Sequence, residues 1–156
     1  MTTDLRRLPT VLVAEDDPDD RDLTREAFAA ARAAGDLRFV EDGQELLDYL
    51  YRRGAYADEG LSPRPDLLLL DLNMPRLDGR EALRQIKADP DLRLMRVVIL
   101  TTSRASEDIV AAYDISASSY ITKPTSYRHL LSVIESLAQY WLEVVELPPA
   151  RSPRAT

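Results

Sequence analysis

The chain has 156 residues, which is enough for one well-buried domain and too few for two ordinary ones. Its composition, 45% hydrophobic and 30% charged, is typical of a globular protein and not of a disordered one, and a net charge of −7 argues against a nucleic-acid-binding surface. With no cysteine and one histidine, His129, the sequence excludes a disulfide framework, thiol catalysis and a zinc site built from Cys and His.

No segment of the sequence points to a membrane. Residues 1–7 lack the apolar core of a signal peptide. No run approaches the roughly 20 apolar residues of a membrane-spanning helix. We therefore expect a cytoplasmic protein with no membrane partner.

The first half of the chain alternates short apolar runs with amphipathic segments. Residues 11–14 predict a strand, and the acidic run 15–20 follows it directly. Residues 37–40 predict a second strand, and Asp42-Gly43 leads into a helix that extends to Tyr51. Between the two strands a helix is expected over about 19–34, ended by Gly35. Its apolar face would consist of Leu23, Ala27, Ala30, Ala31 and Ala34.

The second half repeats this alternation after a long connection, 52–65, that is rich in Gly, Pro and charge. Connections of that length are uncommon in compact domains unless they are functional or mobile. The third strand, 67–71, opens with four consecutive leucines, as expected for a strand buried on both faces of a parallel sheet. The later elements are strands over 96–101 and 119–122 and helices over about 80–88, 106–114 and 126–145.

Five strands alternating with five helices predict a parallel sheet with helices on both faces. Right-handed crossovers bring the carboxyl ends of the strands to one edge, where open α/β sheets carry their chemistry. The polar residues expected at that edge are Glu15 and Asp16 after the first strand, Asp71 and Asn73 after the third, Thr101 at the end of the fourth and Lys123 after the fifth.

These residue types suit phosphoryl chemistry. Three carboxylates in one place repel each other unless a cation lies among them, and Mg²⁺ prefers oxygen ligands. Lys123 could pair with an added phosphoryl oxygen, and the Thr101 hydroxyl could donate a hydrogen bond to another. We interpret the set as a site that carries a phosphoryl group on Asp71. Taken singly, each residue also has an ordinary explanation: the acidic run as a helix cap, and Lys123-Pro124 as a turn.

Together these segments resemble the signature of response-regulator receiver domains, over about residues 9–146. The resemblance is carried by Glu15-Asp16, Asp71-Leu72-Asn73-Met74-Pro75, Asp78-Gly79, Leu100-Thr101-Thr102 and Tyr120-Ile121-Thr122-Lys123-Pro124.

The resemblance implies a flavodoxin-like doubly wound (βα)5 fold with strand order 2-1-3-4-5. Asp71 would be the phosphoacceptor, and Lys123 would be the phosphoryl-binding lysine. The peptide bond between Lys123 and Pro124 would be cis. Thr101 and Tyr120 match the paired switch positions. The ligands of Mg²⁺ (or Mn²⁺) would be Asp16, Asp71, the backbone carbonyl of Asn73 and, through a bound water, Glu15.

The long 52–65 connection, together with the ending from Tyr140 to Pro148, resembles stand-alone receivers that partner bacterial and cyanobacterial phytochrome histidine kinases. We accordingly expect an N-terminal extension (1–8), a receiver domain (9–147) and a disordered tail (148–156). Output would then depend on protein contacts, because nine residues after Leu147 are too few for an output domain. A homodimer or partner surface is expected on helix four, strand five, the last helix and the C-terminal segment, at Tyr140, Leu142, Val145 and Leu147.

Three alternatives remain at this point. A phosphatase of the dehalogenase type also uses a strand-end Asp with Mg²⁺, but it usually has a second Asp where this chain has Asn73. A flavodoxin-like ligand carrier would have a Ser-, Thr- and Gly-rich loop in place of Glu15-Asp16-Asp17. A receiver-like scaffold without phosphorylation would not need the complete set of site residues.

Overall fold

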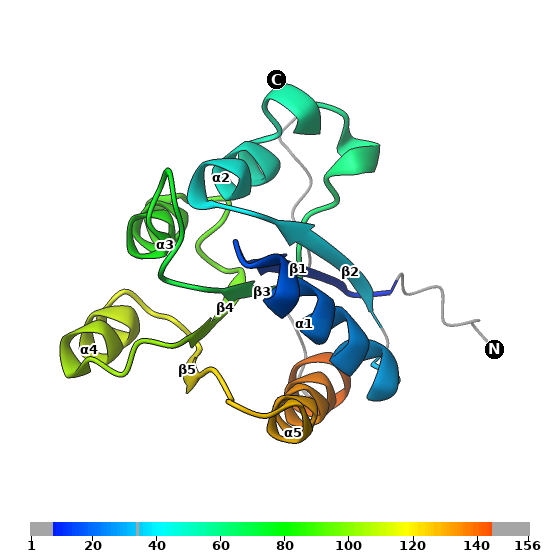
Figure 1. The fold of residues 1–156 in the computed structure, drawn as a ribbon. Helices are drawn as coiled ribbons and strands as arrows, with labels where there is room; N and C mark the ends of the chain where they lie inside the picture. The colour runs from blue at the N-terminus through cyan, green and yellow to red at the C-terminus, as the bar shows by residue number, and fades with distance from the viewer. Residues whose placement is uncertain (1–7, 34, 145–156) are drawn as a thin grey trace.

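The chain folds around a parallel five-stranded sheet whose strands alternate with helices (Figure 1). The structure, a computed structural model, describes residues 8–33 and 35–144, with residues 143 and 144 described by their backbone alone. The strand order is β2-β1-β3-β4-β5, and every neighbouring pair is parallel, which confirms the predicted fold. The strands are β1 (Thr10–Ala14), β2 (Asp36–Val40), β3 (Leu67–Leu70), β4 (Arg96–Thr101) and β5 (Ser119–Thr122).

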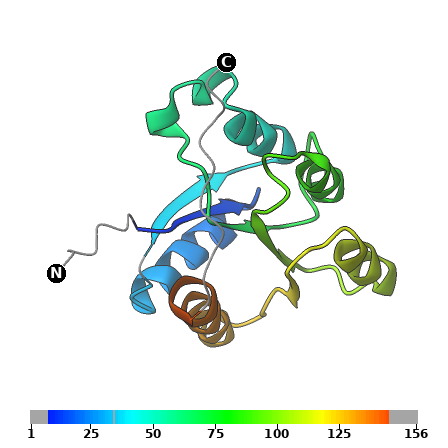
Figure 2. The same ribbon diagram turned by 180° about the vertical axis from the view of Figure 1, so that it is seen from behind.

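Helices cover both faces of the sheet. The views from the front and from behind place α1 and α5 on one face and α2, α3 and α4 on the other (Figures 1 and 2). The apolar core is divided accordingly into two clusters, one on each face. The helices are α1 (Pro18–Ala30), α2 (Gly43–Tyr51), α3 (Gly79–Ala88), α4 (Ser106–Asp114) and α5 (Tyr127–Leu137), and a π-helical turn (Ala138–Val144) continues α5.

The leucine run of β3 explains how one strand supports both clusters. Successive side chains of a strand point to opposite faces. Leu68 and Leu70 therefore lie in the cluster under α2, α3 and α4, and Leu67 and Leu69 lie in the cluster under α1 and α5. All four are buried, and β3 is the middle strand of the sheet, between β1 and β4.

Most helices begin at a side chain that accepts hydrogen bonds from free backbone N–H groups. Asp17, Asp42, Asp78 and Ser126 cap α1, α2, α3 and α5 in this way. The exception is α4, whose N-cap residue Ala105 makes no such bond. The start of α4 is therefore held by other contacts.

The first and last helices differ from their predicted extents. The residue Arg32, in the left-handed region at φ 53°, turns the chain away from α1 before Gly35. The face of α1 that packs inward is formed by Thr24, Ala27 and Phe28, whereas Leu23 and Ala30 are exposed. The buried face thus differs from the predicted one because it includes Thr24, a polar residue that the apolar pattern does not indicate. The predicted last helix ends as α-helix at Leu137 and continues as the π-helical turn.

The long connection 52–65 is packed against the domain by polar side chains. It contains two short 3₁₀ turns, Gly54–Tyr56 and Glu59–Leu61. The hydroxyl of Tyr49 in α2 donates to the carbonyl of Pro63 (2.7 Å), and the hydroxyl of Tyr56 donates to Glu45 (2.7 Å). The connection is thus anchored to α2, on the side of the sheet away from β5.

Candidate functional site

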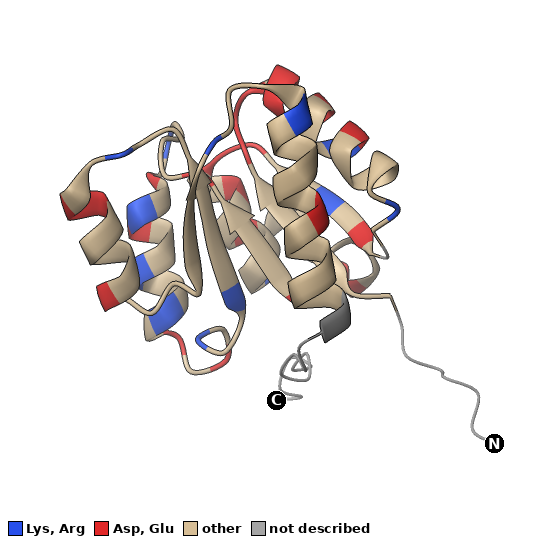
Figure 3. Cartoon of the chain, turned by 90° about the horizontal axis from the view of Figure 1, so that it is seen from below, with Lys and Arg blue, Asp and Glu red and all other residues tan. Residues whose placement is uncertain are grey.

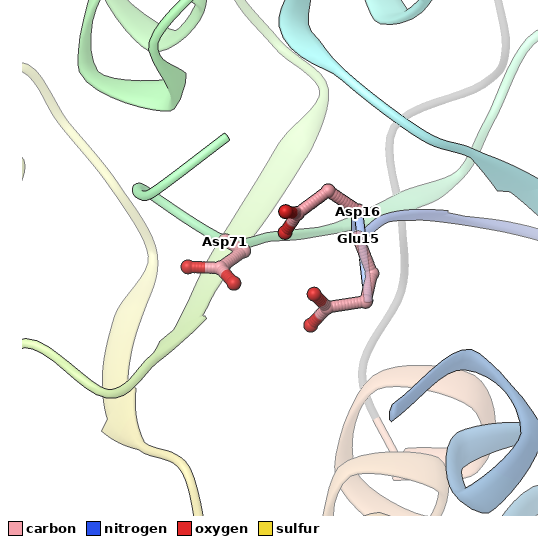
Figure 4. Close-up of side chains that lie close together, drawn as sticks. All are labelled: Glu15, Asp16 and Asp71. Atoms are coloured by element: carbon pink, nitrogen blue, oxygen red, sulfur yellow. The ribbon is translucent and has the colours of Figure 1, made fainter. Parts of the chain in front are cut away.

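The acidic residues expected at one edge of the sheet do converge there. In the β1–β3 register Ala14 is paired with Leu70, so the residues that follow them leave the sheet side by side. Carboxylate oxygens of Glu15, Asp16 and Asp71 lie within 4.8 Å of one another, and Figure 4 shows the three groups facing a common space. Glu15 and Asp71 are buried and Asp16 is exposed.

Asp71 is held in place through both of its carboxylate oxygens. Its Oδ1 accepts hydrogen bonds from the Thr101 hydroxyl (2.8 Å) and from the backbone N–H of Asn73 (3.0 Å). Its Oδ2 accepts from the ammonium of Lys123 (2.9 Å). Only 6% of Asp71 is exposed, and Thr101 is fully buried. The carboxylate is therefore oriented by partners on β4 and after β5; their predicted role in binding phosphoryl oxygens stays a prediction.

Lys123 is surrounded by carboxylates. Besides Asp71 it binds Asp20 (2.9 Å) and forms an ion pair with Glu15. Burial alone would lower the pKa of Lys123, but its hydrogen bonds to these three carboxylates outweigh burial and raise the pKa above its usual value. The lysine is a fixed cation at the site.

Glu15 is the carboxylate most affected by its surroundings. Burial raises its pKa to about 7, against the lowering effect of Lys123 beside it. The negative charge of Asp71 adds to the increase. The single positive charge of Lys123 thus offsets the negative charge of the carboxylates only in part. The remaining negative charge favours the binding of an additional cation.

The donor set suits a divalent cation of the Mg²⁺ or Mn²⁺ type. It consists of carboxylate oxygens only, which hard cations prefer, and it lies at the carboxyl ends of the strands with Asp16 exposed. Figure 3 shows acidic segments of the ribbon among the loops at this end of the strands. The carbonyl of Asn73 as a further ligand stays a prediction.

A close backbone approach below the site explains Asp78-Gly79. A Cβ on Gly79 would lie 2.2 Å from the backbone carbonyl oxygen of Asp71, so a side chain at this position would displace the strand end that carries Asp71. The N–H of Gly79 also donates to the carbonyl of Leu72 (3.0 Å). The start of α3 is therefore locked to the segment that follows Asp71.

Two site residues were not singled out by the sequence. The carboxylate of Asp20 was interpreted as part of a helix cap, yet Asp17 makes the cap and Asp20 turns to Lys123. The guanidinium of Arg21 binds the carbonyls of Glu15 (2.9 Å) and Asp16 (3.0 Å) and so holds the loop that carries them. A helix cap needs only one acceptor side chain, and the run after β1 contains several acids. This surplus is the feature of the sequence that could have indicated another role for Asp20.

The remaining predicted residues, as far as the structure describes them, lie apart from the acidic cluster. Tyr120 is partly buried against the core under α2, α3 and α4, and its hydroxyl donates to the carbonyl of Ser103 (2.9 Å). Tyr140 is 52% exposed, whereas Leu142 packs partly against the core under α1 and α5. The other two residues of the predicted dimer surface, Val145 and Leu147, lie outside the described residues, as do the predicted tail and residues 1–7.

The predicted cis bond before Pro124 is wrong. No peptide bond is cis in the described part of the chain, so Lys123–Pro124 is trans, the isomer that X–Pro bonds generally prefer. Lys123 nevertheless binds the Asp71 carboxylate. In the same ranges, 8–33 and 35–144, no helix is both long and apolar enough to cross a membrane.

Comparison with known proteins identifies the class that this fold and site define. A model of the response regulator receiver domain matches residues 11–135. The chain belongs to this family, whose members are phosphoacceptor signalling modules.

Several relatives match along nearly their whole length. Response regulator Rcp1 of Synechocystis is 38% identical over 140 residues, which cover 90% of this chain and 93% of Rcp1. The crystal structure of the Mn²⁺-bound form of Rcp1 superposes with a TM-score of 0.82 at 37% identity, covering 90% of this chain and 99% of that one.

Two further solved structures are similarly close. The phosphorylated cyanobacterial phytochrome response regulator RcpA gives a TM-score of 0.85 at 38% identity, covering 91% of this chain and 99% of its own. A response regulator in red light signaling of R. palustris gives 0.84 at 45% identity, with coverage of 90% and 99%. The acidic cluster of Glu15, Asp16 and Asp71 matches the divalent metal site of receivers.

Proposed function

We propose that this chain is a stand-alone response regulator that accepts a phosphoryl group on Asp71 from a sensor histidine kinase. The observation that carries the proposal is the Asp71 carboxylate itself. It is buried, bound on one oxygen by Thr101 and on the other by Lys123, and it lies beside Glu15 and Asp16.

The side chains around Asp71 supply what phosphoryl transfer needs. A carboxylate oxygen of Asp71 attacks the phosphorus of the phosphohistidine on the kinase. The bond from phosphorus to the histidine nitrogen breaks, and its electron pair stays on that nitrogen. Lys123 and Thr101 then bind phosphoryl oxygens and offset the charge that they carry. A divalent cation held by Glu15, Asp16 and Asp71 would neutralise the remaining charge when bound. The chain thereby assists its own phosphorylation and dephosphorylation.

The kinase partner is inferred from the relatives. RcpA is a cyanobacterial phytochrome response regulator, and two further solved relatives, each 33% identical, are bacteriophytochrome response regulators. We therefore propose a bacterial phytochrome kinase as the phosphodonor.

The output is proposed to be a change in protein contacts. Thr101 and Tyr120 lie on the neighbouring strands β4 and β5, and β5 contacts α4, on which Val110 is 68% exposed and Tyr113 51% exposed. A homodimer is proposed through α4, β5, α5 and the C-terminal segment from Tyr140 onward. Sedimentation that shows only monomer at tens of micromolar, with and without phosphorylation, would contradict the proposed dimer. Phosphorylation-dependent association that is unchanged in Tyr120→Ala would contradict the proposal that Tyr120 couples phosphorylation of Asp71 to association.

The test of the proposed function uses acetyl phosphate with Mg²⁺, followed by intact-mass measurement. We expect one added phosphoryl group in the wild-type chain, none in Asp71→Asn, and none when a chelator is present. Lack of an adduct in the wild-type chain, together with no binding of the phosphoryl mimic beryllofluoride, would contradict the proposal.

The same sample distinguishes the phosphatase alternative. Steady turnover of a phosphomonoester would favour a phosphatase, and a single slow turnover favours a receiver. The position of the second acid in such phosphatases is occupied by Asn73, which has no carboxyl proton to give and is exposed. This residue is what favours the receiver.

A further inference from the structure

A polar network joins the start of α3 to the start of α4. The guanidinium of Arg80 binds Asp108 through two hydrogen bonds, Nε to Oδ1 (2.7 Å) and a terminal nitrogen to Oδ2 (2.6 Å). Asp108 also accepts a hydrogen bond from the Ser103 hydroxyl (2.6 Å), and the carbonyl of Ser103 accepts one from the Tyr120 hydroxyl (2.9 Å). One ion pair therefore supports the loop between β4 and α4 and, through that loop, Tyr120.

Both ends of this network reach the phosphoacceptor. Ser103 lies two residues after Thr101, and its backbone N–H donates to the Thr101 hydroxyl oxygen (3.4 Å), which itself donates to Asp71. At the other end, Arg80 follows Gly79, which is locked against the segment after Asp71, and its guanidinium lies 3.5 Å from the side-chain oxygen of Asn73. The pair thus bridges the segment that follows Asp71 and the loop that follows Thr101.

Few other contacts determine where α4 begins. Its N-cap residue Ala105 has no side chain that can cap the helix, although its backbone N–H donates to the Ser103 hydroxyl oxygen (3.4 Å), and Ala112 is its one buried residue. The two hydrogen bonds from Arg80 and the one from Ser103 to Asp108 add to the few contacts that hold this end of α4. The position of residues 102–105 therefore depends on the Arg80–Asp108 pair more than on packing.

We propose that Arg80 and Asp108 are positioning residues for phosphoryl acceptance at Asp71. Acting through Ser103, the pair keeps the Thr101 hydroxyl directed at Asp71 and Tyr120 against the core, the arrangement in which the site can receive a phosphoryl group. The inference rests on the proposed function. When the pair is broken the loop populates other positions, and the apparent affinity for a phosphoryl group falls by the fraction of molecules that remain in the competent arrangement.

The experiment measures the affinity for beryllofluoride with Mg²⁺ in the wild-type chain, Arg80→Gln and Asp108→Asn, by titration calorimetry. The two substitutions change the local charge in opposite directions. A simple field effect would therefore weaken binding of the anionic mimic in Arg80→Gln and strengthen it in Asp108→Asn. A positioning role weakens binding in both, and we expect roughly a three- to tenfold loss in each.

A second arginine–aspartate pair supplies the matched control. Arg76 binds Asp42 through two hydrogen bonds (2.9 and 3.1 Å), but this pair joins the loop after β3 to α2 and has no contact with Ser103 or Thr101. We expect Arg76→Gln to leave the beryllofluoride affinity unchanged to within about twofold. The double variant with Arg80→Asp and Asp108→Arg restores a pair of opposite charges and is expected to recover at least part of the lost affinity. Thermal unfolding monitored by circular dichroism confirms that each variant is folded.

The outcomes separate this inference from the proposed function. Shifts of opposite sign in the two single variants, or unchanged affinity in both, overturn the positioning role while the wild-type chain still binds the mimic. Losses as large in Arg76→Gln as in Arg80→Gln overturn it as well. Failure of the wild-type chain to bind beryllofluoride contradicts the proposed function instead.

Discussion

The centre of the sheet and its β5 edge are built in different ways. All four residues of β3 are buried, whereas all four residues of β5 are partly exposed. The helices that follow differ likewise, since α3 buries Ala82, Leu83 and Ile86 and α4 buries only Ala112. The segments that open most readily are those with few buried apolar contacts. Asp71 therefore follows a strand that is packed on both faces, whereas the proposed contact surface on α4 and β5 lies where few apolar side chains are buried.

The two regions also differ in what holds them. Leucine contacts support β3 from both faces, and they are lost only when the core opens. The loop after β4 and the start of α4 depend instead on hydrogen bonds among Arg80, Ser103, Asp108 and Tyr120. Hydrogen bonds can be exchanged for bonds to water or to a phosphoryl group at a small net cost. The contrast predicts that substitutions in the two regions have unequal effects.

The largest difference is expected between two substitutions that remove apolar side chains. Leu69→Ala deletes a buried leucine and leaves a cavity, so we expect a loss of about 2 to 5 kcal/mol in the free energy of unfolding. Val110→Ala removes a side chain that is 68% exposed, and about 0.5 kcal/mol or less should be lost. Urea denaturation of both variants measures the difference, and equal losses would show that α4 is packed more tightly than its burial indicates.

The centre was also the region most accessible to prediction. Four consecutive leucines followed by Asp71 are sufficient to indicate a doubly buried strand with a carboxylate at its end. Because parallel strands place their carboxyl ends at one edge, the positions of Glu15, Asp16, Thr101 and Lys123 followed from the order of the elements.

Contacts between side chains that are distant in sequence were not accessible in the same way. Arg80 and Asp108 are 28 positions apart, and each has nearer partners of opposite charge, such as Asp78 for Arg80. Asp20 is 103 positions from Lys123 and lies among other acids. Neither pair has a periodic or local signal, because the first depends on how α3 and α4 are placed and the second on how α1 lies beside the loop after β5. The inward face of α1 differs from its prediction for a related reason, since the tertiary fold buries Thr24.

An intermediate effect is expected from Asp108 as the pH falls. The hydrogen bonds from Arg80 and Ser103 lower the pKa of Asp108 to about 2, below the 3.8 of an unperturbed aspartate. A carboxyl with a lowered folded pKa stabilises the fold fully above the unfolded pKa, and that stabilisation is lost as the pH falls toward the folded value. Because Arg80 is 36% exposed, solvent screening limits the contribution to about 1 kcal/mol.

Comparison of Asp108→Asn with the wild-type chain isolates this contribution. The difference in free energy of unfolding should be present at pH 6 and should shrink between about pH 4 and pH 2. Glu107→Gln is the control, because Glu107 also lies in the first turn of α4 but is exposed. A difference for Asp108→Asn that stays constant with pH would mean that Asp108 is not held by Arg80 in solution.

The narrowest comparison of the two regions uses two tyrosine hydroxyls that bind backbone carbonyls. Tyr49 donates to Pro63 (2.7 Å) and is 3% exposed, while Tyr120 donates to Ser103 (2.9 Å) and is partly exposed. Because the Tyr49 side chain is buried, water replaces its hydroxyl poorly, and Tyr49→Phe should cost about 1 to 3 kcal/mol; water can replace the Tyr120 hydroxyl, so Tyr120→Phe should cost about 0.5 to 1 kcal/mol. Urea denaturation gives both values. A cost for Tyr120→Phe equal to that for Tyr49→Phe would place Tyr120 in the rigid part of the fold, whereas a smaller cost leaves its hydroxyl free to exchange partners when the loop after Thr101 moves.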